Sequence, residues 1–507
     1  MHIRVIGAGV MGRGIAQWAV TGGHTVELGD ARADAVGEAC EFVRGMLSRA
    51  VDKGRMSADE AAAAVARLRP LDSPWAPGAE VELVIEAVRE DLDTKAEVFT
   101  RLAEALPEST IFATNTSSIP VTRIAARLDD PTRLAGLHFF NPVPLMRIVE
   151  IVPGARTRDG IPAVLAELVE GCGHRAVLVS DTPGFLVNHA GRGLVTEALA
   201  VLEESVADVA GIDRIAREVL GLRMGPFELM DLTGLDVTAA VIDSVWDGFR
   251  HSDRLRPSFL TPNRVAAGLH GRKTGAGFYD HADGVRTAAS AEEEPVSGDG
   301  DRPCLVHGTG PEADELRAAL DSAGVPRAAD PAADATLVLV PVWGGTVAEA
   351  VAAHGLPPER TVGVDPLSVP TGRRVLAATP ASSPEAVRDA RAVLARGADP
   401  GTAAAVTVVR DAHGSVAQRL LASIVGVAAS IAERGLAAPE DVDAAVTTAL
   451  GYPHGPLTWG DRVGAARLLV LQSALFASTG DPRYRPTRWV TERARLGLPL
   501  TAPAYPL

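Results

Sequence analysis

The stretch Ile6-Gly7-Ala8-Gly9-Val10-Met11-Gly12 decides the fold of this 507-residue chain. It follows a short apolar run, and the residues after it, Ile15, Trp18 and Ala19, recur at helical spacing. Glycines in this pattern allow a tight turn, let backbone N–H groups approach a pyrophosphate, and let the helix pack closely on the strand. The N-terminus of that helix adds positive potential. The stretch therefore predicts the first strand, turn and helix of a Rossmann-type domain.

An acidic residue follows at the position where such a domain recognises ribose. Asp30 comes at the end of a second strand-like run, 25–28. A carboxylate there accepts hydrogen bonds from the ribose and repels a 2′-phosphate, which favours NAD over NADP. The nearby cation Arg32 would attract a 2′-phosphate, which slightly weakens the inferred preference for NAD. The alternative is a glycine turn without a ligand, and the register of strand, helix and acid argues against it.

Strand-like and helical runs alternate over residues 1–183, which predicts an α/β Rossmann-type NAD-binding domain with a mostly parallel sheet and helices on both faces. After Asp181-Thr182-Pro183-Gly184 the apolar residues recur at helical spacing, so we expect an all-α domain over 184–283. Residues 284–302 are polar and lack periodicity. They are predicted to be a linker.

The chain then repeats itself. A shift of 230 residues without a gap aligns Gly184 with Gly414, Glu203 with Glu433 and Gly225-Pro226 with Gly455-Pro456. This predicts a second helical domain over 410–507. Between the linker and this copy, Cys304 to Gly310 with Ala313 resembles an eroded nucleotide-binding turn, so a degenerate Rossmann-like domain is expected over 303–409. The fold class is thus an α/β domain and an all-α domain followed by a degenerate copy of both.

Composition limits the function. The net charge of −15 argues against nucleic acid or anionic membrane as partner. Cys40, Cys172 and Cys304 lack metal or disulfide spacing, which favours a reducing compartment and no metal site. The longest uncharged stretch late in the chain, 420–432, is judged too short to span a bilayer, and the first residues predict a strand, not a signal peptide. We expect a cytoplasmic protein.

Four residues form a candidate catalytic set. His138 follows a predicted strand at the carboxyl edge where open α/β sheets bind ligands, and imidazole suits proton abstraction near neutral pH. Glu150 ends the next apolar run and can orient the ring. Ser117 and Asn188 are expected to bracket the substrate oxygen. The structural alternatives are a buried histidine, a surface glutamate and an asparagine that caps a helix.

Residues 1–281 resemble the L-3-hydroxyacyl-CoA dehydrogenase family. The motifs that carry this resemblance are Gly-Ala-Gly-Val-Met-Gly, Asn115-Thr116-Ser117-Ser118, 136–142, 181–188, 225–228 and 273–279. The longer architecture is similar to bacterial 3-hydroxybutyryl-CoA and 3-hydroxyadipyl-CoA dehydrogenases. The resemblance implies reversible, NAD-dependent oxidation of (S)-3-hydroxyacyl-CoA to 3-ketoacyl-CoA in fatty-acid or aromatic-acid catabolism.

The resemblance also assigns roles to residues. His138 is the general base paired with Glu150, and Ser117 and Asn188 contact the 3-oxygen of the substrate. The residues expected to contact the cofactor are Gly7, Gly9, Val10, Met11, Gly12, Asp30, Glu90, Lys95 and Asn115. Lys53 and Arg55 are the candidates for coenzyme A contacts, and a solvated helix end is the alternative for both.

The second half is predicted to be catalytically silent. It offers no equivalent of the histidine or of the Asn-Thr-Ser-Ser turn, and Gln418 replaces Asn188. We therefore expect one NAD and one acyl-CoA per chain. The second helical domain is expected to cover the apolar face of the first, as an intrachain pseudo-dimer. Whole chains can still form a homodimer. An N-terminal half cut off at the linker should dimerise or aggregate.

Two other functions remain open from the sequence. A non-catalytic NAD-binding protein is possible because a fold does not fix a function. An NAD-dependent dehydrogenase of a free hydroxy acid would keep the same residues and change the substrate. An absorbance assay at the nicotinamide band tests the first, and the exchange of acetoacetyl-CoA for acetoacetate tests the second.

Overall fold

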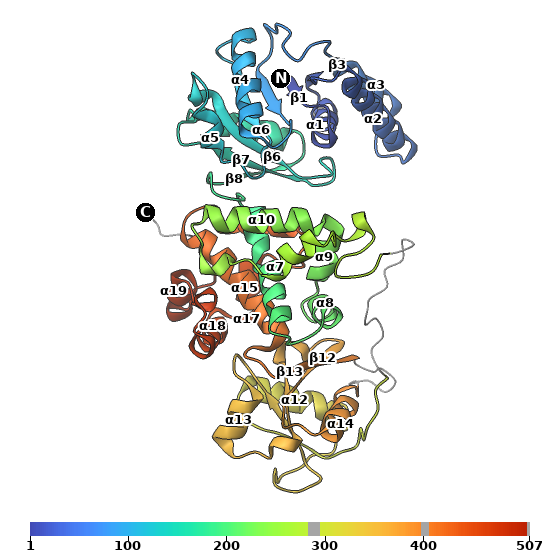
Figure 1. Ribbon diagram of the computed structural model, residues 1–507, viewed down its shortest axis with the longest axis vertical. Helices are drawn as coiled ribbons and strands as arrows, with labels where there is room; N and C mark the ends of the chain where they lie inside the picture. Colours follow the sequence, from blue (N-terminus) through green and yellow to red (C-terminus); the bar gives the residue numbers. More distant parts are fainter. Residues whose placement is uncertain (282–294, 397–404, 504–507) are drawn as a thin grey trace. The chain divides into compact units, whose positions relative to one another are not determined.

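The computed structural model describes residues 1–281, 295–396 and 405–503, which fall into two compact units (Figure 1). The first unit contains Met1–His189 and Gly435–Leu450, and the second contains Ala190–Arg434 and Gly451–Leu507. Of the predicted linker, residues 284–294 lie outside the described residues. Residues 295–302, which are described, contain no helix or strand.

An eight-stranded sheet forms the core of the first unit, in the order β3-β2-β1-β4-β5-β6-β7-β8. Every neighbouring pair is parallel except β6 and β7. The central strands are nearly continuous apolar runs, as expected where helices cover both faces. The strands are β1 (His2–Ile6), β2 (Thr25–Gly29), β3 (Leu68–Pro70), β4 (Leu83–Glu86), β5 (Ile111–Thr114), β6 (Leu134–Phe139), β7 (Ile148–Pro153) and β8 (Arg175–Leu178).

Helices connect these strands as the sequence predicts. They are α1 (Val10–Thr21), α2 (Ala33–Asp52), α3 (Ala58–Arg67), α4 (Leu92–Ala105), α5 (Val121–Ala125) and α6 (Gly160–Gly171). Asp181 accepts the backbone N–H groups of Val121 (2.9 Å) and Thr122 (2.7 Å), and so ties the segment after β8 to the first turn of α5. The prediction of a mostly parallel Rossmann-type sheet is confirmed.

A helix from the far end of the chain also belongs to the first unit. This helix, α16 (Pro439–Ala449), packs on β7 and the edge strand β8. The Ser180 N–H donates to the Leu436 carbonyl oxygen at 2.9 Å, and Arg175 lies 2.8 Å from Asp441. The outer edge of the sheet is therefore covered by a segment that the sequence places in the last domain.

The second unit combines helices with a smaller sheet. Its first group of helices comprises the main part of α7 (Val187–Glu203), α8 (Val209–Glu218), α9 (Pro226–Thr233), α10 (Leu235–Gly248) and α11 (Leu260–Ala266). A second group comprises α15 (Ser415–Glu433), α17 (Pro456–Val463), α18 (Ala465–Thr479) and α19 (Arg488–Leu496). The sequence-predicted helical character of 184–281 and of 410–503 is thus observed.

The smaller sheet has the strand order β13-β12-β11-β10-β9, and its only antiparallel pair among the described residues is β11 with β12. The strands are β9 (Cys304–Val306), β10 (Leu337–Pro341), β11 (Thr361–Val364), β12 (Arg373–Ala378) and β13 (Ala405–Arg410). The helices between them are α12 (Pro311–Ser322), α13 (Val347–His354) and α14 (Pro384–Leu394). The predicted strands at 335–342 and 361–364 are confirmed.

One expectation about α15 was wrong. The stretch 420–432 belongs to a 19-residue helix that is long and apolar enough to cross a membrane by length and composition. The surrounding protein buries 94% of its apolar window, which is typical of a core helix. The prediction considered only the uncharged stretch, which Arg419 ends on one side, and Arg419 lies buried within the longer helix.

Candidate active site

The glycine turn after β1 has the geometry of a dinucleotide cradle. Gly7 has a φ of 103°, which favours glycine, and a Cβ on Gly12 would lie 1.6 Å from the Gly7 carbonyl oxygen. A Cβ on Gly9 would meet no protein atom within 4 Å. Gly9 also begins α1, whose first turn contains no acidic residue. The turn therefore fits a pyrophosphate close to the backbone, at the positive end of the helix.

Asp30 lies directly after β2, next to this cradle. Its carboxylate accepts the backbone N–H of Ala8 at 2.7 Å and that of Arg32 at 2.9 Å. These bonds fix the carboxylate at the carboxyl edge of the sheet, where ribose is expected. Val10 and Met11, which open α1, line the same turn; the Val10 side chain is 54% exposed.

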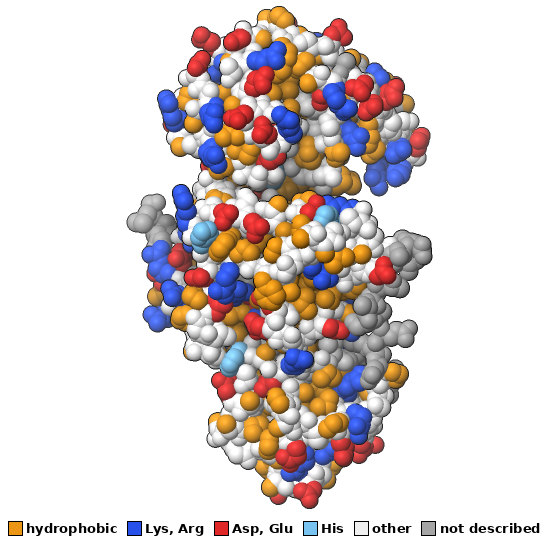
Figure 2. Space-filling view, in the orientation of Figure 1, with side chains coloured by type: hydrophobic (Ala, Val, Ile, Leu, Met, Phe, Trp, Pro, Cys, Tyr) orange, Lys and Arg blue, Asp and Glu red, His pale blue; other side chains and the backbone are white. Residues whose placement is uncertain are grey.

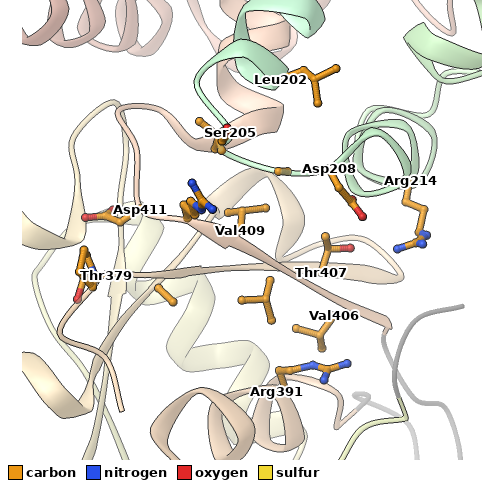
Figure 3. Close-up of a pocket in the computed structure, with 16 residues that line it drawn as sticks. Leu202, Ser205, Asp208, Arg214, Thr379, Arg391, Val406, Thr407, Val409 and Asp411 are labelled. Carbon is orange, nitrogen blue, oxygen red and sulfur yellow. The ribbon is translucent and has the colours of Figure 1, made fainter. Parts of the chain in front are cut away.

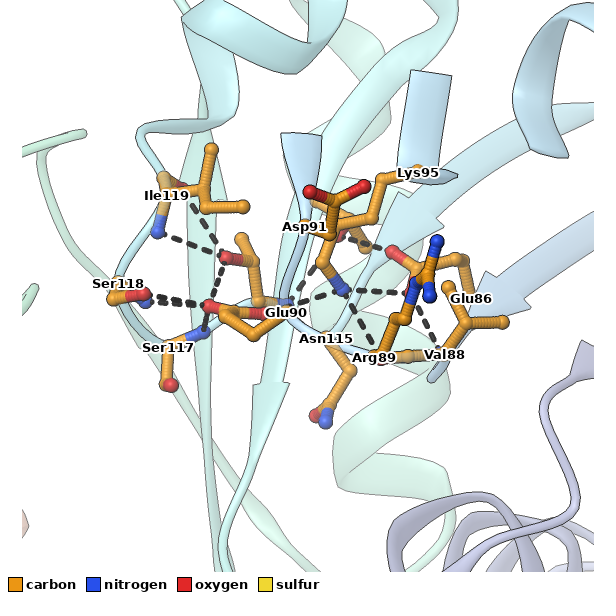
Figure 4. A network of polar contacts seen from close by, with 12 residues as sticks. Glu86, Val88, Arg89, Glu90, Asp91, Lys95, Asn115, Ser117, Ser118 and Ile119 are labelled. Atoms are coloured by element: carbon orange, nitrogen blue, oxygen red, sulfur yellow. Dashed lines mark hydrogen bonds and ion pairs between the residues drawn. The ribbon is translucent and has the colours of Figure 1, made fainter. Parts of the chain in front are cut away.

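The Asn-Thr-Ser-Ser turn after β5 is held by one carboxylate (Figure 4). Oε1 of Glu90 accepts the N–H groups of Ser117 (2.9 Å) and Ser118 (2.8 Å), and the Thr116 hydroxyl donates to it at 2.7 Å. Burial would raise the pKa of Glu90, but Lys95 and these hydrogen bonds lower it to about 2. Glu90 is therefore an anion at physiological pH, and it fixes the backbone on which Ser117 stands.

Lys95 joins this turn to the sheet. Its buried ammonium lies 3.2 Å from Oε2 of Glu90 and 2.7 Å from Oε1 of Glu86. Glu86, at the end of β4, also accepts the Thr114 hydroxyl at 2.7 Å, and its burial raises the pKa of that carboxyl group. The sequence reasoning missed Glu86. The available signal was an acidic residue directly after the apolar run 83–85.

Asn115 ties β5 to β6. Its side-chain oxygen accepts the Phe139 backbone N–H at 2.8 Å. Because Gly136 pairs with Thr114 in the parallel β5–β6 ladder, Ser117 and His138 leave the sheet at the same carboxyl edge. The structure thus brings together the two sequence-predicted residues that come from neighbouring strands.

His138 and Glu150 form a buried pair. Nδ1 of His138 lies 2.5 Å from Oε2 of Glu150, in register across the antiparallel β6–β7 ladder. The other oxygen of Glu150 accepts the N–H groups of Leu186 (3.0 Å) and Val187 (2.8 Å). The pair is 5% and 0% exposed. Since Nδ1 is engaged, Nε2 is the nitrogen that can take a proton from a substrate.

Asn188 follows directly after Val187, in the first turn of α7. Its backbone is therefore anchored, through Val187, to the carboxylate that orients His138. Ser117, His138, Glu150 and Asn188 all belong to the first unit. The four predicted residues thus share one unit, and their catalytic roles stay a prediction. The sequence did not reveal the bonds from the 186–187 backbone to Glu150.

Lys53 and Arg55 lie apart from this set. Both are exposed in the turn between α2 and α3, and Figure 2 shows basic side chains gathered at that end of the helix pair. Arg44 and Arg49 of α2 are exposed as well. The turn can attract a phosphate, and the assignment of coenzyme A to it stays a prediction.

The described residues contain no group of three or more histidine, cysteine or carboxylate side chains that could hold a metal ion. The three cysteines are unpaired thiols, and burial raises the pKa of Cys172 to about 11. The site thus combines a dinucleotide cradle with an oriented histidine base, and these define a nicotinamide-dependent dehydrogenase.

Comparisons with known proteins agree with this class. Residues 2–182 match the model of the 3-hydroxyacyl-CoA dehydrogenase NAD binding domain. Residues 184–281 and 414–500 both match the model of the C-terminal domain of the same family. The 3-hydroxyadipyl-CoA dehydrogenase of Escherichia coli K12 is 36% identical over 97% of each chain. The mitochondrial hydroxyacyl-coenzyme A dehydrogenase of Sus scrofa is 38% identical over 55% of this chain and 91% of its own.

A solved structure extends the likeness to the whole chain. The crystal structure of 3-hydroxybutyryl-CoA dehydrogenase from Escherichia coli K12 superposes with a TM-score of 0.84, at 34% identity, over 98% of both chains. The chain belongs to the 3-hydroxyacyl-CoA dehydrogenase family. It is an NAD-binding oxidoreductase, as the sequence predicts.

Proposed function

We propose that the chain catalyses the reversible, NAD-dependent oxidation of a (S)-3-hydroxyacyl-CoA to the 3-ketoacyl-CoA. The observation that carries this proposal is the 2.5 Å contact between His138 and Glu150, at the sheet edge that also holds the Gly9 cradle. A histidine oriented by a buried carboxylate is the arrangement that a hydroxyl oxidation needs.

Each residue of the site has one task in this reaction. Nε2 of His138 takes the proton of the 3-hydroxyl group, and Glu150 stabilises the imidazolium that results. Ser117, on the turn held by Glu90, and Asn188 bind the substrate oxygen and orient it. NAD, when bound, accepts the hydride. In the reverse direction His138 returns its proton to the 3-oxygen, so the same groups serve ketone reduction.

The substrate is inferred to be a thioester of coenzyme A. The names of the relatives, 3-hydroxyadipyl-CoA and 3-hydroxybutyryl-CoA dehydrogenase, support this class and leave two kinds of acyl group. A kinetic panel of 3-hydroxyacyl-CoA thioesters with and without a terminal carboxylate would distinguish them. We expect the absorbance of the nicotinamide band to change with acetoacetyl-CoA as substrate and to stay constant with acetoacetate. Equal turnover with acetoacetate would favour a dehydrogenase of free hydroxy acids.

We further propose that residues 303–503 are a degenerate second copy of the first half. Three hydrogen bonds of the first half recur in the second half, at a shift close to 230 residues. The Asp181 carboxylate caps α5, and Asp411 accepts the Val347 N–H of α13 at 2.8 Å in the same way. The Arg410 N–H donates to the Val206 carbonyl at 2.8 Å, as Ser180 does to Leu436.

The third pair of equivalent hydrogen bonds lies in the two helical domains. The Phe259 N–H donates to Glu203 at 3.0 Å, and the Trp489 N–H donates to Glu433 at 2.9 Å. The bonds to Glu203 and Glu433 lie within the two segments, 184–281 and 414–500, that match one family model. Since this copy lacks the catalytic histidine, we propose one active site per chain, with the second helical domain as a built-in partner of the first.

A further inference from the structure

The imidazole of His138 packs against two aromatic rings in the first unit. Its ring centroid lies 4.5 Å from that of Phe140 and 5.6 Å from that of Phe185, with interplanar angles of 62° and 61°. Edge contacts of this kind are a preferred geometry of aromatic pairs. Phe140 directly follows β6, whereas Phe185 comes from the loop that leads into α7 and is only 3% exposed. The reaction proposed above gives neither ring a task.

Phe185 has a backbone conformation that residues with a side chain rarely adopt. Its φ is 47°, and that of the preceding Gly184 is 72°. These two left-handed residues turn the chain so that the next two N–H groups converge on Oε1 of Glu150, at 3.0 and 2.8 Å. Successive backbone N–H groups in such a turn form a site for an anion. The turn that Phe185 completes therefore fixes the carboxylate that orients His138.

The second half of the chain repeats this turn without the ring. The shift of 230 residues maps Gly184 and Phe185 onto Gly414 and Ser415, whose φ values are 68° and 47°. The N–H groups of Phe185 and Ser415 each donate to the carbonyl oxygen three residues earlier, at 2.9 and 3.1 Å. The strained backbone is thus common to both halves, and the aromatic side chain occurs only in the half that carries His138.

We propose that Phe185 is a positioning residue for the base: its backbone turn fixes Glu150, and its ring fixes the tilt of the His138 imidazole. This inference rests on the proposed function. The hydrogen bond at Nδ1 and the bond to Cβ still leave the imidazole some freedom to tilt, and contact with a rigid aromatic edge restricts it. Because the lone pair of Nε2 lies in the plane of the imidazole, a tilted ring would miss the proton that it has to accept.

The ring of Phe185 also keeps water away from the buried pair. The attraction between Glu150 and the imidazolium that forms during the reaction is stronger where water is excluded. A smaller side chain at position 185 would admit water beside His138 and let the imidazole tilt. Both changes slow the proton transfer. They leave the glycine turn after β1 and the carboxylate of Asp30 as they are, so NAD binding should not change.

The test compares two substitutions of Phe185 in the full chain, with acetoacetyl-CoA and NADH as substrates. Phe185→Leu keeps an apolar side chain without a flat ring, and we expect kcat to fall about tenfold. Phe185→Gly keeps the left-handed turn and removes the side chain, so the loss should reach on the order of 10²-fold. The KM for acetoacetyl-CoA and the Kd for NAD should stay close to those of the wild type, because only the step at the reacting proton is affected.

Two controls separate positioning from a merely structural role. Ser415→Gly relieves the same backbone strain in the second half and should leave kcat unchanged. In the His138→Gln background, Phe185→Leu should cause no further loss, because no imidazole remains to be oriented. A general weakening of the fold would lower the residual rate again. Circular dichroism of each variant shows whether it is folded before kcat is compared.

Wild-type kcat in both Phe185 variants would overturn the proposal. It would also be overturned by a loss that appears in KM or in NAD affinity with kcat unchanged, or by one that multiplies with the loss in His138→Gln. These outcomes leave the proposed function standing as long as the wild type reduces acetoacetyl-CoA and His138→Gln does not. A wild type that fails to reduce acetoacetyl-CoA would contradict the proposed function itself, and with it the role of Phe185.

Discussion

The two α/β domains of this chain differ in how they arrange the polar groups near their strand ends. In the first, Glu150 orients His138 and leaves Nε2 available for substrate. In the second, Asp365 follows β11 and is buried against Gln418, which occupies the position of Asn188. The amide of Gln418 donates to Asp365 at 2.9 Å and accepts the Gly344 N–H at 2.9 Å. In the second domain these polar side chains are therefore hydrogen-bonded to groups of the same domain.

The space around the second sheet differs as well. The cavity of about 950 Å³ in the second unit lies between residues 202–208 and β13 (Figure 3). It is lined by Asp208, Arg214, Thr379 and Arg391, and Asp365 and Gln418 do not line it. A large cavity in this half is thus distinct from the positions that correspond to the catalytic site. The comparison teaches that the location of oriented polar groups, and not cavity size, identifies the active domain.

The largest expected effect comes from the base of the first domain. His138→Gln should reduce kcat on the order of 10²- to 10⁴-fold, because it removes the proposed general base that Glu150 orients. NAD binding, measured by nicotinamide fluorescence or calorimetry, should stay close to that of the wild type. Near wild-type turnover in this variant would remove His138 from the mechanism.

A smaller effect is expected for Glu150→Gln. The amide keeps an acceptor for the N–H groups of Leu186 and Val187 but removes the negative charge beside Nδ1. We expect about a ten- to hundredfold loss of kcat, and the acid limb of the pH–rate profile should move to lower pH, since an amide stabilises imidazolium less than a carboxylate does. An unchanged pH–rate profile would contradict the pairing.

A substitution of the buried Asp365 in the second domain should change the free energy of unfolding and leave turnover unchanged. Burial raises the pKa of Asp365 to about 6, and its Oδ2 has no hydrogen-bond partner. Because the folded state holds this proton more tightly than the unfolded state, the stability of the chain should fall as pH rises from about 4 to about 6.

Asp365→Asn removes that dependence. One pKa unit is worth about 1.4 kcal/mol, so the variant should gain at most about 3 kcal/mol at pH 7. Urea unfolding at several pH values measures the slope, and kcat should equal that of the wild type. A loss of turnover would show that the second domain takes part in catalysis.

The smallest expected effect concerns cofactor choice. The wild type should prefer NAD, and Asp30→Ala should narrow the ratio of kcat/KM for NAD over NADP about tenfold. Because Asp30 also accepts the Ala8 N–H, Asp30→Asn serves as the control that keeps an acceptor and removes the charge. Equal efficiency with NADP in the wild type would show that Arg32 outweighs the acid.

Much of this comparison was predictable from the sequence. The G-x-G-x-x-G turn, the alternation of elements over 1–183 and the 230-residue repeat are sequence patterns, and they predicted the helices and strands of both halves. The proximity of His138 and Glu150 was also predicted, and their catalytic roles stay a prediction. Contacts between distant segments were not predictable in this way. The bonds from Glu90 to the Ser117 turn, and the packing of α16 on β8, depend on tertiary placement.

Gln418 illustrates the limit most clearly. The sequence showed that it replaces Asn188, but only the structure shows that its longer side chain reaches both Asp365 and Gly344. Glu197 and Arg419 are similar, since 222 residues separate the two partners of the buried ion pair. Neither residue has a local pattern that reveals its partner.

The central claim is that one half of the chain carries one dehydrogenase site and the other half carries none. Isothermal titration calorimetry of the full chain with NAD tests this most directly, with the active fraction fixed by independent titration of the enzyme. We expect one binding event per chain, with a stoichiometry that His138→Gln and Asp365→Asn leave unchanged. Two equivalent NAD sites per chain would contradict the account.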